Sequence, residues 1–478
     1  MCDDDRSSDP YRALGLDPAD RIDGSRRAFL RRSAALGLAG VATPFVSSLA
    51  AIGEAAAATA GDYKALVCVF LYGGNDHANT LTPYHQAGYA AYQAARANLA
   101  LTRDQLAPGL LTPATALPNG RQYALAPAMQ PLLPLFNGGK MAAVMNLGTL
   151  VQPTTKAQYT AASVKLPPKL FSHNDQQSYF QASNPEGATS GWGGRIGDLL
   201  QSGNGSSTLT CINASGNAVY LTGRAAVQYS IGSGGPVALL GNGSSVFGSS
   251  AAVSTLKSLM TGGNGHVIGN EHAVVARRAL DTYAQVTAAL GNAPAASFPL
   301  FPSGNSLADQ LRIVARMISV SSELGAKRQV FFVSLGGFDM HENLAAAHPV
   351  QIGLVANAMR AFYDTTAALG VADKVTTFTA SDFGRTLTSN TSGADHGWGS
   401  MHFVMGGAVK GQRLYGTAPA IGSGTADDVG QGRLVPTTSV DQYASTLASW
   451  FGVGTGDMTT VLPNMGNYTP STWNLGFV

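Results

Sequence analysis

Several segments of the chain consist of apolar, aromatic and β-branched residues in unbroken runs. The clearest of these runs are residues 65–72, 141–147, 329–335, 375–380 and 401–409. Runs without polar alternation are typical of strands that are covered on both faces, as in a parallel sheet flanked by helices. The pattern therefore predicts a central, mostly parallel β-sheet.

Between these runs, the spacing of apolar residues changes to that of a helix. In residues 306–324, Leu307, Leu311 and Val314 recur at helical spacing. Similar patterns predict helices at residues 84–97, 125–136, 270–290, 350–369 and 440–451. Strands that alternate with helices indicate an α/β fold with a doubly wound, mostly parallel sheet sandwiched by helices.

One part of the chain departs from this alternation. Glycine, serine, asparagine and alanine concentrate in residues 201–265. Because 45% of the whole chain is hydrophobic, this composition favours long surface loops over disorder. We expect residues 183–265 to form a glycine-rich insertion or a cap on the α/β domain.

The N-terminal segment has the features of an export signal. Residues 25–30 read Ser-Arg-Arg-Ala-Phe-Leu, a twin-arginine motif, and an alanine-rich apolar stretch leads to Ala-Thr-Ala at residues 58–60. Glycines and Pro44 interrupt the apolar stretch, which favours a cleaved signal over the alternative, a retained N-terminal anchor. We predict a signal peptide over residues 1–60, one α/β domain over residues 61–478, and a periplasmic or secreted protein.

The rest of the chain narrows the range of partners. No later stretch reaches the ~20 uninterrupted apolar residues that a membrane helix needs, so we expect no stable membrane span after cleavage. Charged residues make up 12% of the chain and the net charge is +2, which indicates no basic surface for nucleic acid.

Cys68 and Cys211 could pair in an oxidising compartment, but Cys68 lies inside a predicted strand, which favours two buried, unpaired thiols.

Aspartate and histidine gather in the loops that follow the predicted strands. These residues are Asp76, Asp339, His341, Asp382 and His396. In parallel sheets, ligands bind beyond the carboxyl ends of the strands, and carboxylates together with imidazoles suit a divalent metal ion such as Zn²⁺, Mn²⁺, Fe²⁺ or Ca²⁺. The sequence therefore predicts a metal site of one or two ions at this edge of the sheet.

Each of these residues also has a structural interpretation. Asp339 could cap the following helix, with His341 at the surface, and Asp76 could belong to a turn. Asp382 could form an ion pair with Arg385 that closes a turn. In the functional interpretation, Arg385 is instead a catalytic residue that holds the oxygens of a phosphate or sulfate group.

Four stretches, in this order along the chain, resemble those of a known family. They read Leu-Tyr-Gly-Gly-Asn-Asp at residues 71–76, Phe-Ser-His-Asn-Asp-Gln-Gln at 171–177, Gly-Gly-Phe-Asp-Met-His at 336–341, and Ser-Asp-Phe-Gly-Arg at 381–385 with Asp-His-Gly at 395–397. On these motifs the chain resembles the DUF1501 family of exported twin-arginine proteins. That family is similar in turn to the alkaline phosphatase and sulfatase superfamily.

The resemblance implies an alkaline phosphatase-like fold with two metal ions and a nucleophile at a helix start. It matches Asp76 and Asp382 to metal-binding aspartates and Ser172 to the nucleophile. It also matches Asp339, His341 and His396 to the ligands of one ion. Phe383, however, stands where the superfamily usually has a metal-binding histidine, and Asp339 and His341 are closer in sequence than the corresponding pair in phosphatases. Both departures leave the number of ions open.

The sequence is compatible with three functions. The first is an exported, metal-dependent hydrolase of small or polymeric phosphate or sulfate esters, in which Ser172 attacks and Arg385 holds the ester oxygens. The alternative is a non-catalytic binding protein on the same fold, which the missing histidine at Phe383 favours. The third is a metal-independent serine hydrolase using Ser172 and His173, but the chain has no G-x-S-x-G motif to support it.

Overall fold

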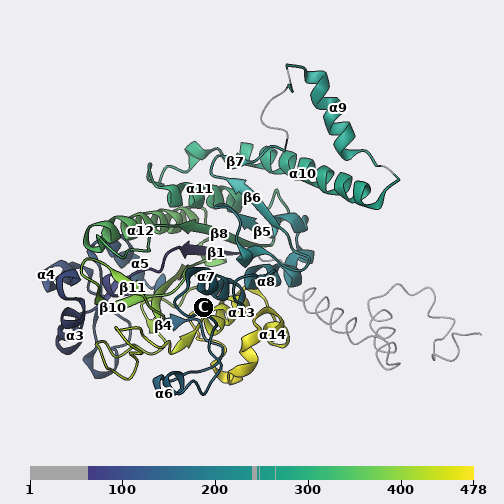
Figure 1. Cartoon of the computed structure of the whole chain (residues 1–478). Coiled ribbons are helices and arrows are strands. Elements are labelled where there is room, and N and C mark those ends of the chain that lie inside the picture. The colour runs from purple at the N-terminus through teal and green to yellow at the C-terminus, as the bar shows by residue number, and fades with distance from the viewer. Residues whose placement is uncertain (1–62, 240–244, 247, 264) are drawn as a thin grey trace, which may run out of the picture. The chain divides into compact units, whose positions relative to one another are not determined.

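A computed structural model of the chain describes residues 63–239, 245–246, 248–263 and 265–478 (Figure 1). The predicted signal peptide, with its twin-arginine motif, lies outside the described residues. The described residues belong to one compact unit.

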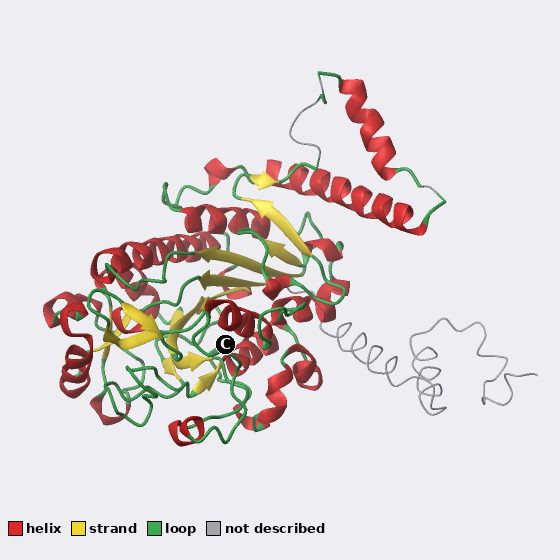
Figure 2. Cartoon of the chain, viewed as in Figure 1, coloured by secondary structure: helices red, strands yellow, loops and turns green. Residues whose placement is uncertain are grey.

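Among the described residues, ten strands form a central, mostly parallel sheet (Figure 2). Their order is β13 (Leu414–Tyr415), β4 (Met141–Gly148), β12 (Ser400–Gly406), β9 (Val375–Ser381), β1 (Lys64–Leu71), β8 (Arg328–Leu335), β5 (Cys211–Asn213), β6 (Gln228–Gly232) and β7 (Gly235–Pro236), and β14 (Thr438–Ser439) pairs with β4. β12 is antiparallel to β4 and β9, and β7 is antiparallel to β6. The unbroken apolar runs thus become β1, β4, β8, β9 and β12, and the predicted α/β fold is confirmed.

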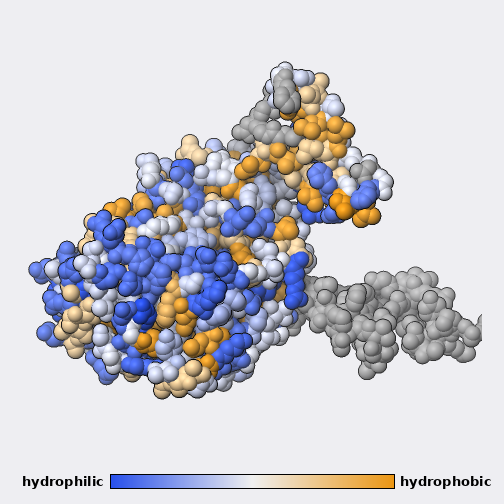
Figure 3. Space-filling model, in the orientation of Figure 1, coloured by the Kyte–Doolittle hydropathy of each residue, from blue (hydrophilic) through white to orange (hydrophobic). Residues whose placement is uncertain are grey.

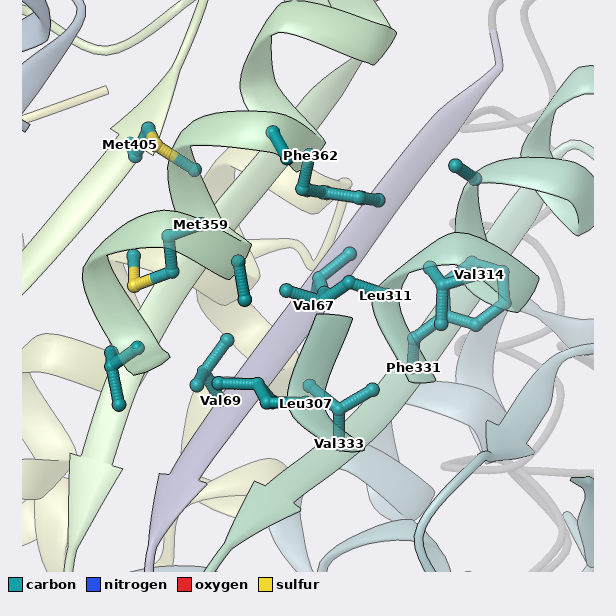
Figure 4. Close-up of a cluster of buried hydrophobic side chains, with 14 of the residues drawn as sticks. Val67, Val69, Leu307, Leu311, Val314, Phe331, Val333, Met359, Phe362 and Met405 are labelled. Carbon is teal, nitrogen blue, oxygen red and sulfur yellow. The ribbon is translucent and has the colours of Figure 1, made fainter. Parts of the chain in front are cut away.

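Two long helices cover one face of the sheet. α11 (Ser306–Ser319) and α12 (Leu344–Ala368) pack on it through a continuous apolar core. Figure 4 shows Val67 and Val69 of β1 among side chains of both helices, including Leu311 and Phe362. Since side chains alternate along a strand, the residues between these valines point to the opposite face.

Aromatic rings line that opposite face. Phe70 of β1 contacts Phe180 of α7 (His173–Ala182) at a centroid distance of 6.0 Å. Phe378 of β9 contacts Trp192 of α8 (Trp192–Leu200) at 5.5 Å and Tyr443 of α13 (Val440–Phe451) at 5.7 Å. Helices therefore cover both faces, which is why the strands lack polar alternation.

Shorter elements complete the described part of the chain. The remaining α-helices are α3 (Gln86–Arg96), α4 (Arg103–Leu106), α5 (Leu133–Asn137), α6 (Lys156–Thr160), α9 (Ser250–Thr261), α10 (Val267–Gly291) and α14 (Met458–Val461). Two small antiparallel pairs stand beside the main sheet: β2 (Leu81–Pro83) with β3 (Tyr123–Leu125), and β10 (Arg385–Ser389) with β11 (Ala394–His396).

The helix predicted at residues 125–136 forms only in part. The segment begins in β3, continues as a 3₁₀-helix at Pro127–Leu132, and becomes α-helical only in α5. Pro127, Pro131 and Pro134 explain the difference, because proline has no N–H to donate within an α-helix.

The glycine-rich segment contributes to the body of the domain. α8 packs beneath the sheet, and β5 and β6 extend it beyond β8. Of the elements in residues 183–265, only α9 packs away from the sheet, against α10. Two strands of the segment, β5 and β6, therefore belong to the main sheet.

Cys68 and Cys211 are both buried and unpaired, as predicted. Burial raises the pKa of the Cys211 thiol to about 12, which leaves it unreactive. Within the described ranges, no helix has the length and apolarity that crossing a membrane requires.

One buried carboxyl makes the stability of the fold depend on pH. Asp441 of α13 is 1% exposed and accepts a hydrogen bond from Ser183 Oγ at 2.9 Å. Burial raises the pKa of Asp441 to about 6. The folded state therefore holds this proton more tightly than the unfolded state, and the resulting stabilisation is lost as the pH rises through about 6.

We predict that the wild type loses up to about 3 kcal/mol of unfolding free energy, relative to Asp441→Asn, between pH 4 and pH 7. The asparagine does not titrate, so the variant lacks this contribution. Urea denaturation of both proteins at a series of pH values measures the difference. Parallel pH profiles would contradict the assignment.

Candidate metal centre

The carboxyl ends of three central strands lie side by side, because the strands pair in parallel register. Leu71 at the end of β1 aligns with Leu335 of β8 and with Ser381 of β9. The loops that follow these residues therefore leave the sheet at one edge, where ligands bind in parallel sheets.

Two further segments reach the same edge. Pairing of β10 with β11 places Arg385 opposite His396. α7 begins at His173, two residues after Phe171, whose φ of +72° lies in the left-handed region. A bulky residue adopts this conformation only when its surroundings hold it there.

Glycine allows the loops to approach one another. A Cβ on Gly73, which has a φ of +112°, would lie 2.3 Å from the backbone nitrogen of Asp339. A Cβ on Gly393 would lie 2.2 Å from the carbonyl carbon of His341. Any larger residue at either position would push the loops, and the side chains they carry, apart.

Four side chains converge at this edge: Asp339, His173, His341 and His396. The Nε2 atom of His396 lies 3.0 Å from His173 Nε2 and 3.0 Å from His341 Nε2. The carboxylate oxygens of Asp339 lie 3.3 Å from His173 Nε2, 3.0 Å from His341 Nε2 and 3.3 Å from His396 Nε2. Among the described residues, His173, Asp339 and His396 form a group whose ligand atoms all lie within 4.8 Å of one another.

The other ring nitrogen of each histidine faces an oxygen acceptor. The three contacts are His173 Nδ1 with Asp382 Oδ2 at 2.6 Å, His341 Nδ1 with Asp395 Oδ1 at 3.1 Å, and His396 Nδ1 with the Phe171 carbonyl at 2.7 Å. Carboxylate and carbonyl oxygens accept hydrogen bonds, so these partners assign the proton of each neutral ring to Nδ1. Each Nε2 then carries a lone pair.

Lone pairs on adjacent Nε2 atoms cannot hydrogen-bond to one another, but together with the Asp339 carboxylate they can bind a cation. Ligand atoms ~2.0–2.2 Å from one tetrahedral ion are separated by roughly 3.3–3.6 Å. The observed separations of 3.0–3.3 Å are close to this range. Histidines that bind metals also donate their other N–H to a carboxylate or a carbonyl, as all three do here. The residues therefore fit a divalent metal ion.

Charges around the cluster keep its carboxylate ionised. Although burial acts in the opposite direction, Arg385, whose Nη1 lies 2.9 Å from Asp339 Oδ1, and the nearby histidines hold the pKa of Asp339 below its usual range. The hydrogen bond to Asp382 raises the pKa of His173, whereas burial lowers the pKa of His396. The Asp339 and His341 side chains are each 45% exposed, so the cluster is open to solvent on their side.

Phe383 packs against the cluster from the protein side. Its ring centroid lies 4.9 Å from that of His173 and 4.9 Å from that of His396. The residue that replaces the expected histidine therefore supports two imidazole rings, and it brings no ligand atom.

Three of the five expected ligands meet in this cluster, and His173 joins them. Asp339, His341 and His396 come together as their positions after the strands indicate. His173 is expected from the sequence only as a partner of Ser172. In the sequence, His173 is marked only by the Ser-His-Asn-Asp stretch at a predicted helix start. This stretch lies far along the chain from Asp339, His341 and His396.

The other two expected ligands have different partners. Asp76 forms an ion pair with Arg96, and both side chains are buried. The carboxylate of Asp382 accepts hydrogen bonds from Gly73 N and Gln177 Nε2 as well as from His173. Asp382 therefore lies behind His173, and Asp76 is held by Arg96.

The two expected catalytic residues differ in their surroundings. Arg385 is 1% exposed and donates to Asp339, the Gly73 carbonyl and the Ala394 carbonyl. The guanidinium is therefore engaged by groups of the protein, and its anion-holding role stays a prediction. Ser172 directly precedes α7, and its Oγ donates to Asp175 Oδ2 at 2.9 Å.

We predict that Asp76→Asn lowers the free energy of unfolding by about 3–5 kcal/mol, because it leaves the Arg96 guanidinium buried without its counter-charge. Chemical denaturation measures this loss. Asp76→Asn/Arg96→Met should recover most of it, since the double variant buries no charge. Full stability in the single variant would show that the ion pair contributes nothing.

Two solved structures resemble the chain at low sequence identity. One is the lipoteichoic acid synthase LtaP from Listeria monocytogenes, with a TM-score of 0.34, 8% identity, and 85% of this chain and 79% of that chain covered. The other is Ps i-CgsB in complex with k-i-k-neocarrahexaose, with a TM-score of 0.35, 10% identity, and 86% and 77% covered. No curated protein matches the sequence.

The family comparison agrees with the motifs at the sheet edge. Residues 63–461 match the family described as "Protein of unknown function (DUF1501)". This range includes every strand end and helix start that contributes to the cluster. The chain therefore belongs to the DUF1501 family.

Proposed function

We propose that this protein is a metal-dependent hydrolase of phosphate or sulfate esters, exported by the twin-arginine route to the periplasm or beyond. The observation that carries the proposal is the set of three Nε2 lone pairs that converge on the Asp339 carboxylate, each fixed by a hydrogen bond at Nδ1. A histidine cluster with a purely structural role does not require all three Nε2 atoms to point at one carboxylate.

The donor set narrows the choice of metal. Three imidazoles and one carboxylate suit Zn²⁺, Mn²⁺ or Fe²⁺, whereas Ca²⁺ prefers oxygen ligands alone. Asp76 and Asp382 are engaged elsewhere and Phe383 brings no ligand atom, so the described residues favour one tightly held ion. A bound ion would polarise the ester and stabilise negative charge on its oxygens.

In this proposal, some side chains bind the ion and others orient its ligands. Asp339 and the three histidines hold the ion, and Asp382 and Asp395 orient two of those histidines. Arg385 keeps Asp339 ionised and in place. These hydrogen bonds fix the proposed metal ligands in place before a substrate binds.

Ser172 is the nucleophile in this proposal. Its Oγ already donates to Asp175 Oδ2 at 2.9 Å, so the carboxylate is placed to take the proton as Oγ attacks. Lys169, which is exposed, lies 3.6 Å from the same carboxylate through its Nζ atom. With Arg385 buried, Lys169 offers a cation to an anionic ester beside Ser172.

One observation supports the alternative, a non-catalytic binding protein. Phe383 takes the place of a ligand that the superfamily usually has, and its ring makes the site more apolar. The serine-hydrolase alternative has less support, because His173 contacts Asp382 and His396 while Ser172 contacts Asp175.

We predict that the exported protein binds about one Zn²⁺, Mn²⁺ or Fe²⁺ per chain. His173→Ala, His341→Ala and His396→Ala should each weaken binding at least ~10-fold, because each removes one of four ligands. His272→Ala, which changes an exposed histidine of α10, is the matched control and should bind normally. Elemental analysis after dialysis against each metal measures the stoichiometry; a metal-free wild type would exclude the metal centre.

We also predict that Ser172→Ala reduces kcat on p-nitrophenyl phosphate or sulfate at least ~100-fold, since it removes the attacking oxygen. Its metal content should stay that of the wild type. Asp175→Asn should lower kcat less, because the hydroxyl remains. Normal turnover by Ser172→Ala would exclude Ser172 as the nucleophile, and a metal-loaded wild type that hydrolyses no ester would favour the non-catalytic alternative.

A further inference from the structure

The N-terminal half of α10 carries an apolar stripe that the described part of the chain leaves uncovered. Val267 and Ile268 are 83% and 74% exposed, and Val274 and Val275 are 42% and 51% exposed. The two pairs are seven residues apart, so they lie on one side of the helix. Figure 3 shows apolar surface over α9 and α10.

The exposed stripe continues the one that anchors α10 to the domain. Further along the same side, Val286 and Leu290 are buried in the main core. α9 packs on α10, where Arg277 Nη2 donates to the Thr261 carbonyl at 2.6 Å. The helix thus has one apolar side, of which the domain covers only the C-terminal part.

Two charges of opposite sign lie on the same side of α10, symmetrically about the Val274–Val275 pair. Glu271 lies three residues before Val274, and Arg278 lies three residues after Val275. Both side chains are exposed, and neither forms an ion pair within the described residues. When two copies of α10 pack antiparallel about a two-fold axis between Val274 and Val275, Glu271 of each copy faces Arg278 of the other.

The composition argues against a lipid surface as the occupant. α10 carries two arginines, Arg277 and Arg278, and two acidic residues, Glu271 and Asp281, so it has no predominantly basic face. Helices that lie on membranes usually combine a face rich in lysine and arginine with tryptophan, phenylalanine or leucine. The exposed side of α10 offers valine and isoleucine beside charges of both signs, which suits a copy of itself.

We propose that the exposed side of α10 binds the same helix of a second copy in antiparallel orientation, which makes the protein a symmetric homodimer. Val274 and Val275 of both copies form the centre of the contact. Two identical ion pairs between Glu271 and Arg278 fix its direction. The proposal is independent of the metal centre and of the reaction proposed for it.

Analytical ultracentrifugation of the exported protein tests whether the stripe is the interface. The wild type should sediment as a dimer, and Val274→Glu as a monomer with an unchanged circular dichroism spectrum. Val350→Glu changes a valine of α12 that is 64% exposed and should leave the dimer intact. A monomeric wild type, or a dimer that Val274→Glu does not weaken, would overturn the proposal.

Charge reversal tests the antiparallel pairing. Glu271→Arg and Arg278→Glu each place two like-charged pairs in the interface and should raise the dimer Kd at least ~10-fold. The double variant restores opposite charges and should return the Kd to near the wild-type value. A double variant weaker than either single one would rule out this pairing. Monomers that sediment with phosphatidylcholine vesicles would instead assign the stripe to a lipid surface.

Discussion

One buried carboxylate, Asp382, joins the segments that build the cluster. It accepts hydrogen bonds from the backbone after β1, from Gln177 within α7, and from Nδ1 of His173 at the start of that helix. Asp382 itself follows β9, so a single side chain links two strand ends and a helix. Without it, His173 would be free to turn, and its Nε2 atom would not face Asp339.

Charge explains why two aspartates at neighbouring strand ends have different roles. Asp76 is buried and forms an ion pair with Arg96, which is buried as well. Asp339 also contacts an arginine, Arg385, but stays 45% exposed and keeps oxygens directed at three imidazoles. Solvent access and the neighbouring groups therefore distinguish the two carboxylates.

The role of the apolar side of α10 depends on its neighbours in the same way. α10 has a single apolar side along much of its length, yet its surroundings divide that side into two parts. The core covers Val286 and Leu290, whereas Val267 and Ile268 remain exposed. Burial of apolar area is the main favourable term in both folding and association, so an uncovered stripe of this kind favours a partner.

The sequence by itself determined the sheet and the edge at which the chemistry gathers. Unbroken apolar runs identify strands covered on both faces, and parallel strands bring Asp339 and His341 to the same edge as the loop that leads to His396. Only the tertiary structure decided which side chains meet there. His173 joins the cluster from a helix that is distant in sequence, Asp76 pairs with Arg96, and Asp382 lies behind His173. The physical reason is that periodicity reports which face of an element is buried, whereas the role of a polar side chain depends on distances of a few ångströms to groups from other segments.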